Sequence, residues 1–200
     1  MKLLIKTFFI TVLLTAAVAQ AQQPAMSALE TVETGVTLLL DTVQEARPLL
    51  SQDETLYYAE IEAVLTEIVD FDAVAMVVMS RYGSIATEGQ IGRFGEILKS
   101  TLTRFYGSAL ASYGGEELVF VPSMNTPADP RADRVIGMEL RGGNSDSIKI
   151  QYQMFLNGDN QWKLKNLSLG GINLGRQYYT QFAAAMTQYN NDIDQVLANW

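Results

Sequence analysis

The sequence contains neither cysteine nor histidine, and it has only 14 lysine and arginine residues against 22 acidic residues. The absence of cysteine and histidine excludes disulfides, zinc-finger clusters, cysteine nucleophiles and the imidazole of a serine–histidine–aspartate triad. A hydrolase or metalloenzyme would therefore depend on carboxylates, lysine, tyrosine or hydroxyl groups alone. The net charge of −8 opposes attraction to polyphosphate, so we expect no nucleic-acid partner.

The first 21 residues have the organisation of a secretory signal peptide. Lys2 and Lys6 flank an apolar run over residues 8–18, and small residues follow it in Ala-x-Ala patterns that end at Ala19 and Ala21. We expect cleavage near one of these two alanines, because the run is too short and its exit too polar for a membrane anchor. The mature chain, residues 22–200, then carries a net charge of −10. We expect it to be an exported single domain whose size allows a core without disulfides.

Hydrophobic periodicity divides the mature chain into helices, strands and helices again. Apolar residues at helical spacing, with capping residues, proline and glycine at the ends, predict helices over residues 26–45, 51–69, 73–79, 87–113, 174–189 and 193–197. Alternating apolar and polar residues predict four strands, over residues 118–121, 134–141, 147–156 and 161–169. The turn-rich connections are short, which favours antiparallel neighbours. The fold class is therefore α+β, with helices packed on one face of a curved four-stranded antiparallel sheet.

Two local patterns predict finer features. The run over residues 73–79 is apolar at every position, which indicates a helix enclosed on all sides. In the strand over residues 161–169 the alternation changes phase after Lys165-Asn166, which predicts a β-bulge or bend there.

The residues alone do not assign a ligand. Pairs of acids and a Gly-Gly turn are more simply explained as solvated surface, helix caps and loop structure than as catalytic or anion sites. The mature chain has seven methionines, and methionine suits surfaces that accept variable apolar partners. Ordinary core packing explains the same methionines, so both interpretations stay open at this point.

Several motifs occur together in an order that is typical of one protein family. The helical half contains Val69-Asp70-Phe71-Asp72, Arg81-Tyr82 and Ala86-Thr87-Glu88-Gly89-Gln90. The strand half and the end of the chain contain Trp162-Lys163-Leu164-Lys165-Asn166-Leu167, Gly171-Ile172-Asn173-Leu174 and Tyr178-Tyr179-Thr180-Gln181-Phe182. In order and spacing these motifs resemble the MlaC family, also called the toluene-tolerance family, from about Met26 to the C-terminus.

Four positions depart from the pattern of that family. The family usually has glycine at Ser80, a second aromatic residue at Gly83, aspartate at Asn166 and arginine at Tyr179. These differences are compatible with a divergent paralogue that takes another lipid or another partner.

The resemblance implies a periplasmic phospholipid carrier of the Gram-negative envelope. Such a carrier holds acyl chains in an apolar cavity between sheet and helices, and it maintains outer-membrane lipid asymmetry. It shuttles lipid between an inner-membrane ABC transporter with a ring of MCE domains and an outer-membrane lipoprotein complex. The resemblance implies no enzymatic activity, no metal and no cofactor, since phospholipid is the cargo. We expect a monomer without stable membrane insertion, loaded through a protein partner because its charge opposes adsorption to anionic lipid.

Candidate cavity residues come from the enclosed apolar run, the helix over residues 87–113, the sheet and the start of the closing helix. They are Met76, Val77, Met79, Leu98, Leu102, Phe105, Val135, Met138, Ile150, Tyr152, Met154, Leu167 and Leu174. The candidate residues for the mouth are Arg81, Tyr82 and Gln90.

Two other functions remain as alternatives. Helices over a curved sheet also form the cone-shaped pockets of enzymes that use a desolvated carboxylate as general base, and Glu139 would be the candidate. A protein that only connects other envelope proteins would need no cavity, so a solid interior would favour a ligand-free adaptor.

Overall fold

The structure, a computed structural model, describes residue 24 and residues 26–121, 127–142 and 147–200. The predicted signal peptide lies outside these residues, as do parts of the connections before the second and third strands. The helices are α1 (Ala28–Ala46), α2 (Leu49–Gln52), α3 (Glu54–Ile68), α4 (Phe71–Met79), the 3₁₀ turn η1 (Ser80–Tyr82), α5 (Glu88–Leu110), α6 (Leu174–Gln188) and α7 (Ile193–Ala198). The strands are β1 (Glu117–Val121), β2 (Arg134–Arg141), β3 (Ile148–Leu156), β4 (Trp162–Leu169) and β5 (Ile172–Asn173).

The strands form one antiparallel sheet in the order β1-β2-β3-β4-β5, which confirms the predicted α+β class. The sheet has five strands where the sequence predicts four. The additional strand is β5, whose two residues pair with Ser168 and Leu169. Gly170 and Gly171 have φ values of 57° and 84°, a conformation that glycine adopts readily. The chain therefore doubles back along β4 before α6 begins.

A bulge interrupts β4 at Lys165. Gln153 of β3 pairs with Asn166, but the next residue, Met154, pairs with Leu164, so Lys165 has no partner of its own. This confirms the predicted irregularity. Because one residue is inserted, Leu164 and Leu167 face the same side of the sheet although they are three positions apart.

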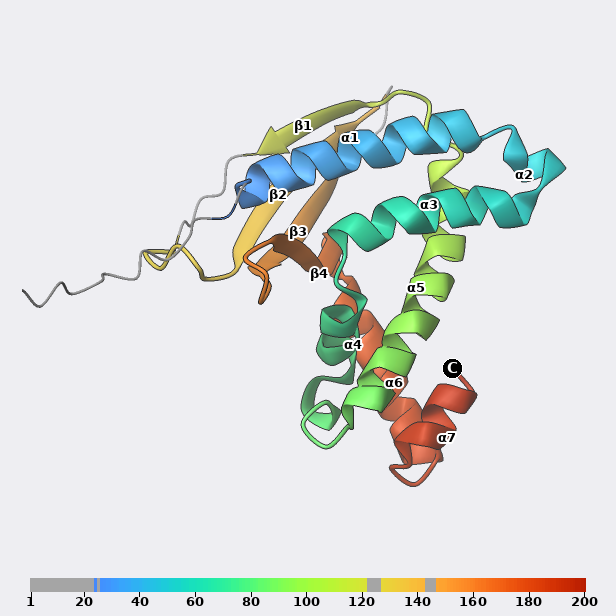
Figure 1. The fold of residues 1–200 in the computed structure, drawn as a ribbon, viewed down its shortest axis with the longest axis vertical. Coiled ribbons are helices and arrows are strands. Elements are labelled where there is room, and N and C mark those ends of the chain that lie inside the picture. The colour runs from blue at the N-terminus through green and yellow to red at the C-terminus, as the bar shows by residue number, and fades with distance from the viewer. Residues whose placement is uncertain (1–23, 25, 122–126, 143–146) are drawn as a thin grey trace, which may run out of the picture.

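The helices form two groups (Figure 1). One group contains α1, which crosses the sheet, α3 beside it, and the C-terminal half of α5. The other group, called the lower helices from their place in Figure 1, contains α4, α6, α7 and the start of α5. Side-chain caps define the helix starts, with capping boxes at Ser27 and Thr87. The helix predicted over residues 51–69 is divided at Asp53, because the Asp53 backbone leaves the helical conformation and ends α2 while its carboxylate caps α3.

The prediction that residues 73–79 are enclosed on every side is wrong. Helix α4 buries Ala75, Val78 and Met79 against α5 and α6, but the Met76 side chain is 41% exposed. The helix is packed on its inner sides only. Its apolar outer residue is accommodated at the surface, where the Met76 thioether lies beside Gly83.

Helix α4 ends at a strained residue. Ser80 has φ 51° and ψ −117°, a conformation that residues with a side chain rarely adopt. Glycine adopts it without the steric conflict between Cβ and the backbone. The turn therefore favours the glycine that the MlaC-like pattern usually has here.

We expect Ser80→Gly to stabilise the protein by about 1 kcal/mol, because relief of backbone strain exceeds the extra flexibility that glycine gives the unfolded chain. Urea denaturation of the two proteins measures the difference. Ser80→Ala is the matched control, since it keeps Cβ and the strain. A Ser80→Gly protein no more stable than Ser80→Ala would contradict the explanation.

Candidate functional site

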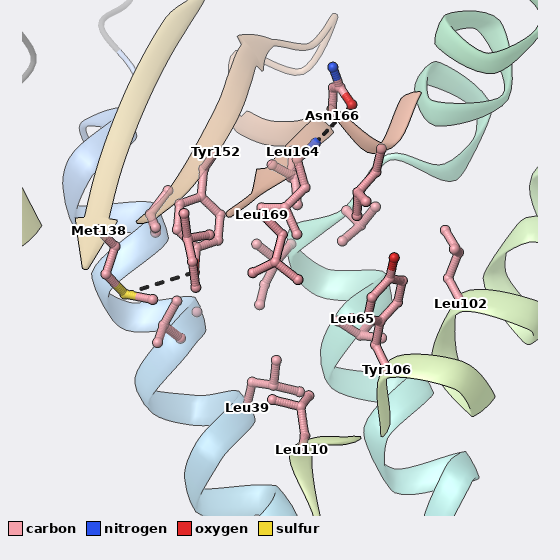
Figure 2. Close-up of a pocket in the computed structure, with 18 of the residues that line it drawn as sticks. Leu39, Leu65, Leu102, Tyr106, Leu110, Met138, Tyr152, Leu164, Asn166 and Leu169 are labelled. Carbon is pink, nitrogen blue, oxygen red and sulfur yellow. Dashed lines mark hydrogen bonds between the residues drawn. The ribbon is translucent and has the colours of Figure 1, made fainter. Parts of the chain in front are cut away.

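A cavity of about 540 Å³ lies between the inner face of the sheet and the helices α1, α3, α5 and α6 (Figure 2). This volume is in the range of small-molecule sites. Strand alternation places Met138, Ile150, Tyr152 and Met154 on the inner face, and α5 contributes side chains at helical spacing on the opposite wall. Nearly all the lining atoms are apolar.

The cavity has a buried end and an open end. Val32, Met154 and Leu98 line the cavity and are almost fully buried. Ala109 and Ser112, at the C-terminal end of α5, line the cavity and are exposed to solvent. Ile148, which begins β3 and is 43% exposed, belongs to the same lining. We therefore place the mouth between the end of α5 and the start of β3.

Two polar side chains of the lining already have partners. The Asn166 Oδ1 accepts hydrogen bonds from the backbone N–H groups of Leu167 and Gly175, and its Nδ2 donates to Asn173 and Gln153. This fixes the end of the sheet to the first turn of α6.

Glu116 is the second polar residue, near the mouth. Its Oε2 accepts from the N–H of Gly114 at 2.9 Å. Backbone hydrogen bonds lower the pKa of Glu116, so this carboxylate stays ionised and is not suited to act as a general base at neutral pH.

The remaining polar groups of the lining are mainly tyrosine hydroxyls. Tyr113 donates to the Glu116 carbonyl at 2.8 Å. Tyr152 has a thioether partner, the Met138 Sδ at 3.8 Å, which is a weak acceptor. Burial raises the pKa of Tyr152. Burial also raises the pKa of Tyr106 to about 12, with a smaller contribution from the nearby Tyr178. Both phenols are therefore neutral at physiological pH.

Eight of the predicted cavity residues lie in the lining. They are Leu98, Leu102, Met138, Ile150, Tyr152, Met154, Leu167 and Leu174. Their contact with a ligand stays a prediction.

The other five predicted cavity residues lie elsewhere. Phe105 is 67% exposed and Val135 is 45% exposed, because the neighbours Tyr106 and Ile136 occupy the inward positions of the helix and the strand. On α4, Met76 is at the surface, Met79 belongs to the core of the lower helices, and Val77 packs against Gly175.

The three predicted mouth residues also lie away from the cavity. Arg81 donates to the Tyr82 hydroxyl at 2.7 Å and stacks on its ring, while Tyr82 is buried in the core formed with α6. Gln90 donates to Asp194 at 3.0 Å and so connects α5 to α7. The motifs that contain these three residues therefore stabilise the packing of the lower helices.

The wall formed by α1 and α3 was not predicted. It is made by Val32, Gly35, Val36, Leu39, Leu40, Leu65 and Ile68. The signal was present as apolar residues at helical spacing in α1. That spacing predicts a buried face but does not show whether the face meets side chains or a cavity.

Glu139 does not meet the requirements of the enzyme alternative. It lies between Met138 and Leu140, which line the cavity, and therefore points to the outer face of β2. Its Oε2 accepts from Arg141 Nη2 at 2.7 Å. Within the described residues, no group of three or more acids is arranged to hold a metal ion. No helix in this part of the chain is long and apolar enough to cross a membrane.

The charge of the mature chain is unevenly distributed. Residues 26–72, which form α1, α2, α3 and the start of α4, contain 11 acids and a single base, Arg47. Residues 73–200 contain 11 acids and 11 bases. The net negative charge therefore belongs to the helical wall of the cavity.

Comparison with known proteins identifies the family. Residues 33–200 match the model of the MlaC family. The chain belongs to the MlaC family. It is 30% identical over 172 residues to the toluene tolerance protein Ttg2D of Pseudomonas putida, an alignment that covers 86% of this chain and 78% of the relative. The fold is similar to that of a phospholipid-binding protein from Ralstonia solanacearum in complex with a phospholipid, with a TM-score of 0.75 and 22% identity, covering 86% and 94% of the two chains.

The departures from the MlaC pattern have local structural explanations. Asn166 donates from Nδ2 to two side-chain oxygens, which an aspartate would not do. At Gly83 a Cβ would come within 3.1 Å of the Met76 thioether, so a larger residue requires Met76 to move. Tyr179 packs against the core of the lower helices. These differences leave the cavity open.

We expect Ala109→Trp to block the mouth, because the indole would project from an exposed lining position of α5. Binding of a fluorescent apolar probe, such as 1-anilinonaphthalene-8-sulfonate, should fall by more than half. Ser108→Trp is the matched control, since Ser108 is exposed on α5 and does not line the cavity. Equal probe binding by the two folded variants would contradict the position of the mouth.

Proposed function

We propose that this protein is a periplasmic carrier that binds the acyl chains of a phospholipid in the cavity and shuttles the lipid between inner- and outer-membrane complexes. The observation that most directly supports this proposal is the open apolar cavity, whose few polar groups are mostly paired within the protein. Membership of the MlaC family supports the same function, and the Ralstonia solanacearum protein of similar fold is a phospholipid complex.

The energetics of lipid transfer favour such a cavity over a polar site. Two acyl chains expose on the order of 30 methylenes, so a lone lipid in water is roughly 24 kcal/mol less stable than in a bilayer, at about 0.8 kcal/mol for each methylene. A carrier must provide similar apolar burial for the lipid to leave the membrane. It must not provide much more, since the lipid must also be released. Apolar contacts without direction meet both conditions.

The partners follow from the family and from the charge of the protein. An inner-membrane ABC transporter with an MCE ring and an outer-membrane lipoprotein complex would deliver and receive the lipid. The acidic helical wall opposes direct adsorption to anionic lipid, which favours loading through a protein. The carrier makes and breaks no covalent bond, and it acts as an exported monomer with phospholipid as cargo.

The two alternatives receive less support. An acid–base enzyme needs a carboxylate in the cavity with a raised pKa, whereas Glu139 is on the outer face and the pKa of Glu116 is lowered. An adaptor that binds only proteins has no use for a cavity of about 540 Å³.

We expect native mass spectrometry of the protein purified from periplasm to detect a bound mass equal to a diacyl phospholipid. Ile150→Glu should weaken lipid retention at least about 100-fold, because it places an unpaired charge in the apolar lining. Gln151→Glu is the control, since the adjacent residue points to the outer face of β3. An empty wild-type protein that also fails to take up labelled lipid would contradict the proposal.

A further inference from the structure

The two edges of the sheet differ in how they are protected. At the β4 edge, the N–H of Asp70 donates to the carbonyl of Leu164 at 3.0 Å, and the Asn166 side chain accepts from the N–H of Leu167. Strand β5 pairs with the C-terminal end of β4. An exposed sheet edge is a template for pairing with another chain, and proteins usually block it in such ways. The β4 edge is therefore closed to further strands.

The opposite edge, formed by β1, has no such protection among the described residues. Strand β1 is the outermost strand (Figure 1), and β2 is the only described element with which it has extensive contact. No backbone hydrogen bond outside the sheet involves β1 in this part of the chain. The strand has no proline, no lysine and no bulge, and the residues after Glu117 are all apolar. It therefore lacks the usual devices that prevent strand addition.

The hydrogen-bond pattern determines which backbone groups of β1 point to the free edge. The carbonyl of Lys149 on β3 accepts at 2.8 Å from the turn after β4, so it points toward β4. Backbone groups alternate in direction along a strand, so those of Ile150 point toward β2 and bond to its partner Met138. Because Met138 bonds to β3, it does not bond to Phe120, its partner on β1. The N–H and C=O of Phe120 therefore point to the free edge, as do those of Leu118.

A segment paired with these groups would find apolar neighbours on both faces of the sheet. Leu118 and Phe120 face inward, whereas Val119 and Val121 face outward. Cross-strand apolar pairs of this kind stabilise an added strand. Leu118 also lines the cavity and lies in the same row of the sheet as the mouth residue Ile148. A strand added to β1 would therefore lie beside the cavity.

The charge of the protein distinguishes between possible occupants of this edge. Residues 22–200 carry a net charge of −10, so two copies of the chain repel each other. Glu116 and Glu117 lie at the start of β1. Arg141 pairs across the sheet with Glu117, but its guanidinium binds Glu139 at 2.7 Å. A positively charged segment is therefore attracted to the edge that repels a second copy.

We propose that β1 is a docking site for an extended, positively charged segment of another protein, which adds to the sheet by bonding to the backbone of Leu118 and Phe120. Docking at β1 does not require a lipid in the cavity. It is therefore independent of the proposed carrier function and adds a protein-binding surface to it.

Amide hydrogen exchange measured by NMR tests this assignment. The probe is a short synthetic peptide that alternates valine and threonine between terminal lysines. At about ten times its Kd, the peptide should slow exchange of the Leu118 and Phe120 amides about 10-fold, because these amides gain an acceptor. The amides of Val119 and Val121 already bond to β2 and should change less. A control peptide with glutamate in place of lysine should bind at least about 5-fold more weakly.

A matched pair of variants tests the role of the backbone. Leu118→Pro removes an N–H that points to the free edge, a position where a strand tolerates proline. Leu118→Ala is the control, since it loses the same side chain but keeps the N–H. We expect the folded proline variant to bind the lysine peptide about 2- to 12-fold more weakly than the alanine variant.

Three outcomes would overturn the proposal. They are no binding of the lysine peptide by the wild-type protein, protection that omits Leu118 and Phe120, and protection of these amides that rises with protein concentration in the absence of peptide. The last outcome would identify a second copy as the occupant. None of these measurements requires the proline variant to fold. Lipid retention is measured separately, so failure of the docking site would leave the carrier function intact.

Discussion

The sheet and the helical wall are held apart, and the space between them is not filled by the protein's own side chains. A cavity is unfavourable because the atoms that line it lose packing partners. Three packed clusters around the cavity offset this cost. The start of α1 packs on the sheet near Trp162, the α1–α3–α5 junction encloses Tyr57, and the lower helices surround Phe94 and Phe182. These clusters fix the walls at a distance that leaves room for a ligand.

A ligand that fills this space stabilises the folded protein by mass action, since it has no comparable site in the unfolded chain. The same apolar contacts give little preference for one orientation or chain length. Directional contacts are confined to a few phenols and to residues, such as Asn166, that are occupied in holding β4 against α6. The lining is therefore mainly apolar surface with few groups that could orient a ligand.

The sequence predicts much of the fold because each of the main signals has a single structural solution. A change of phase in a strand requires an inserted residue, and the structure has that residue at Lys165. The strand order follows from short connections. Interior positions are harder to predict, as Val135 and Phe105 show. Both are apolar, but whether they face inward depends on the phase of the element, which adjacent apolar residues leave ambiguous.

The cavity itself is harder still to predict. An amphipathic helix such as α1 has the same pattern whether it faces a packed core or an open space, so the wall formed by Val36 and Leu39 has no distinctive signal. Likewise, residues 73–79 of α4 are all apolar, but only the neighbouring elements determine which side of the helix is covered. The structure therefore adds the relative positions of elements that the sequence already defines.

The concentration of acidic residues on α1 and α3 gives the molecule an electric dipole as well as a net charge. A dipolar particle rotates in an external field before it makes contact. Near any surface of high negative charge density, the side formed by α1 and α3 is repelled and turned away from the surface. The orientation of approach is therefore determined at a distance of about one Debye length, roughly 8 Å at physiological ionic strength, before short-range contacts form.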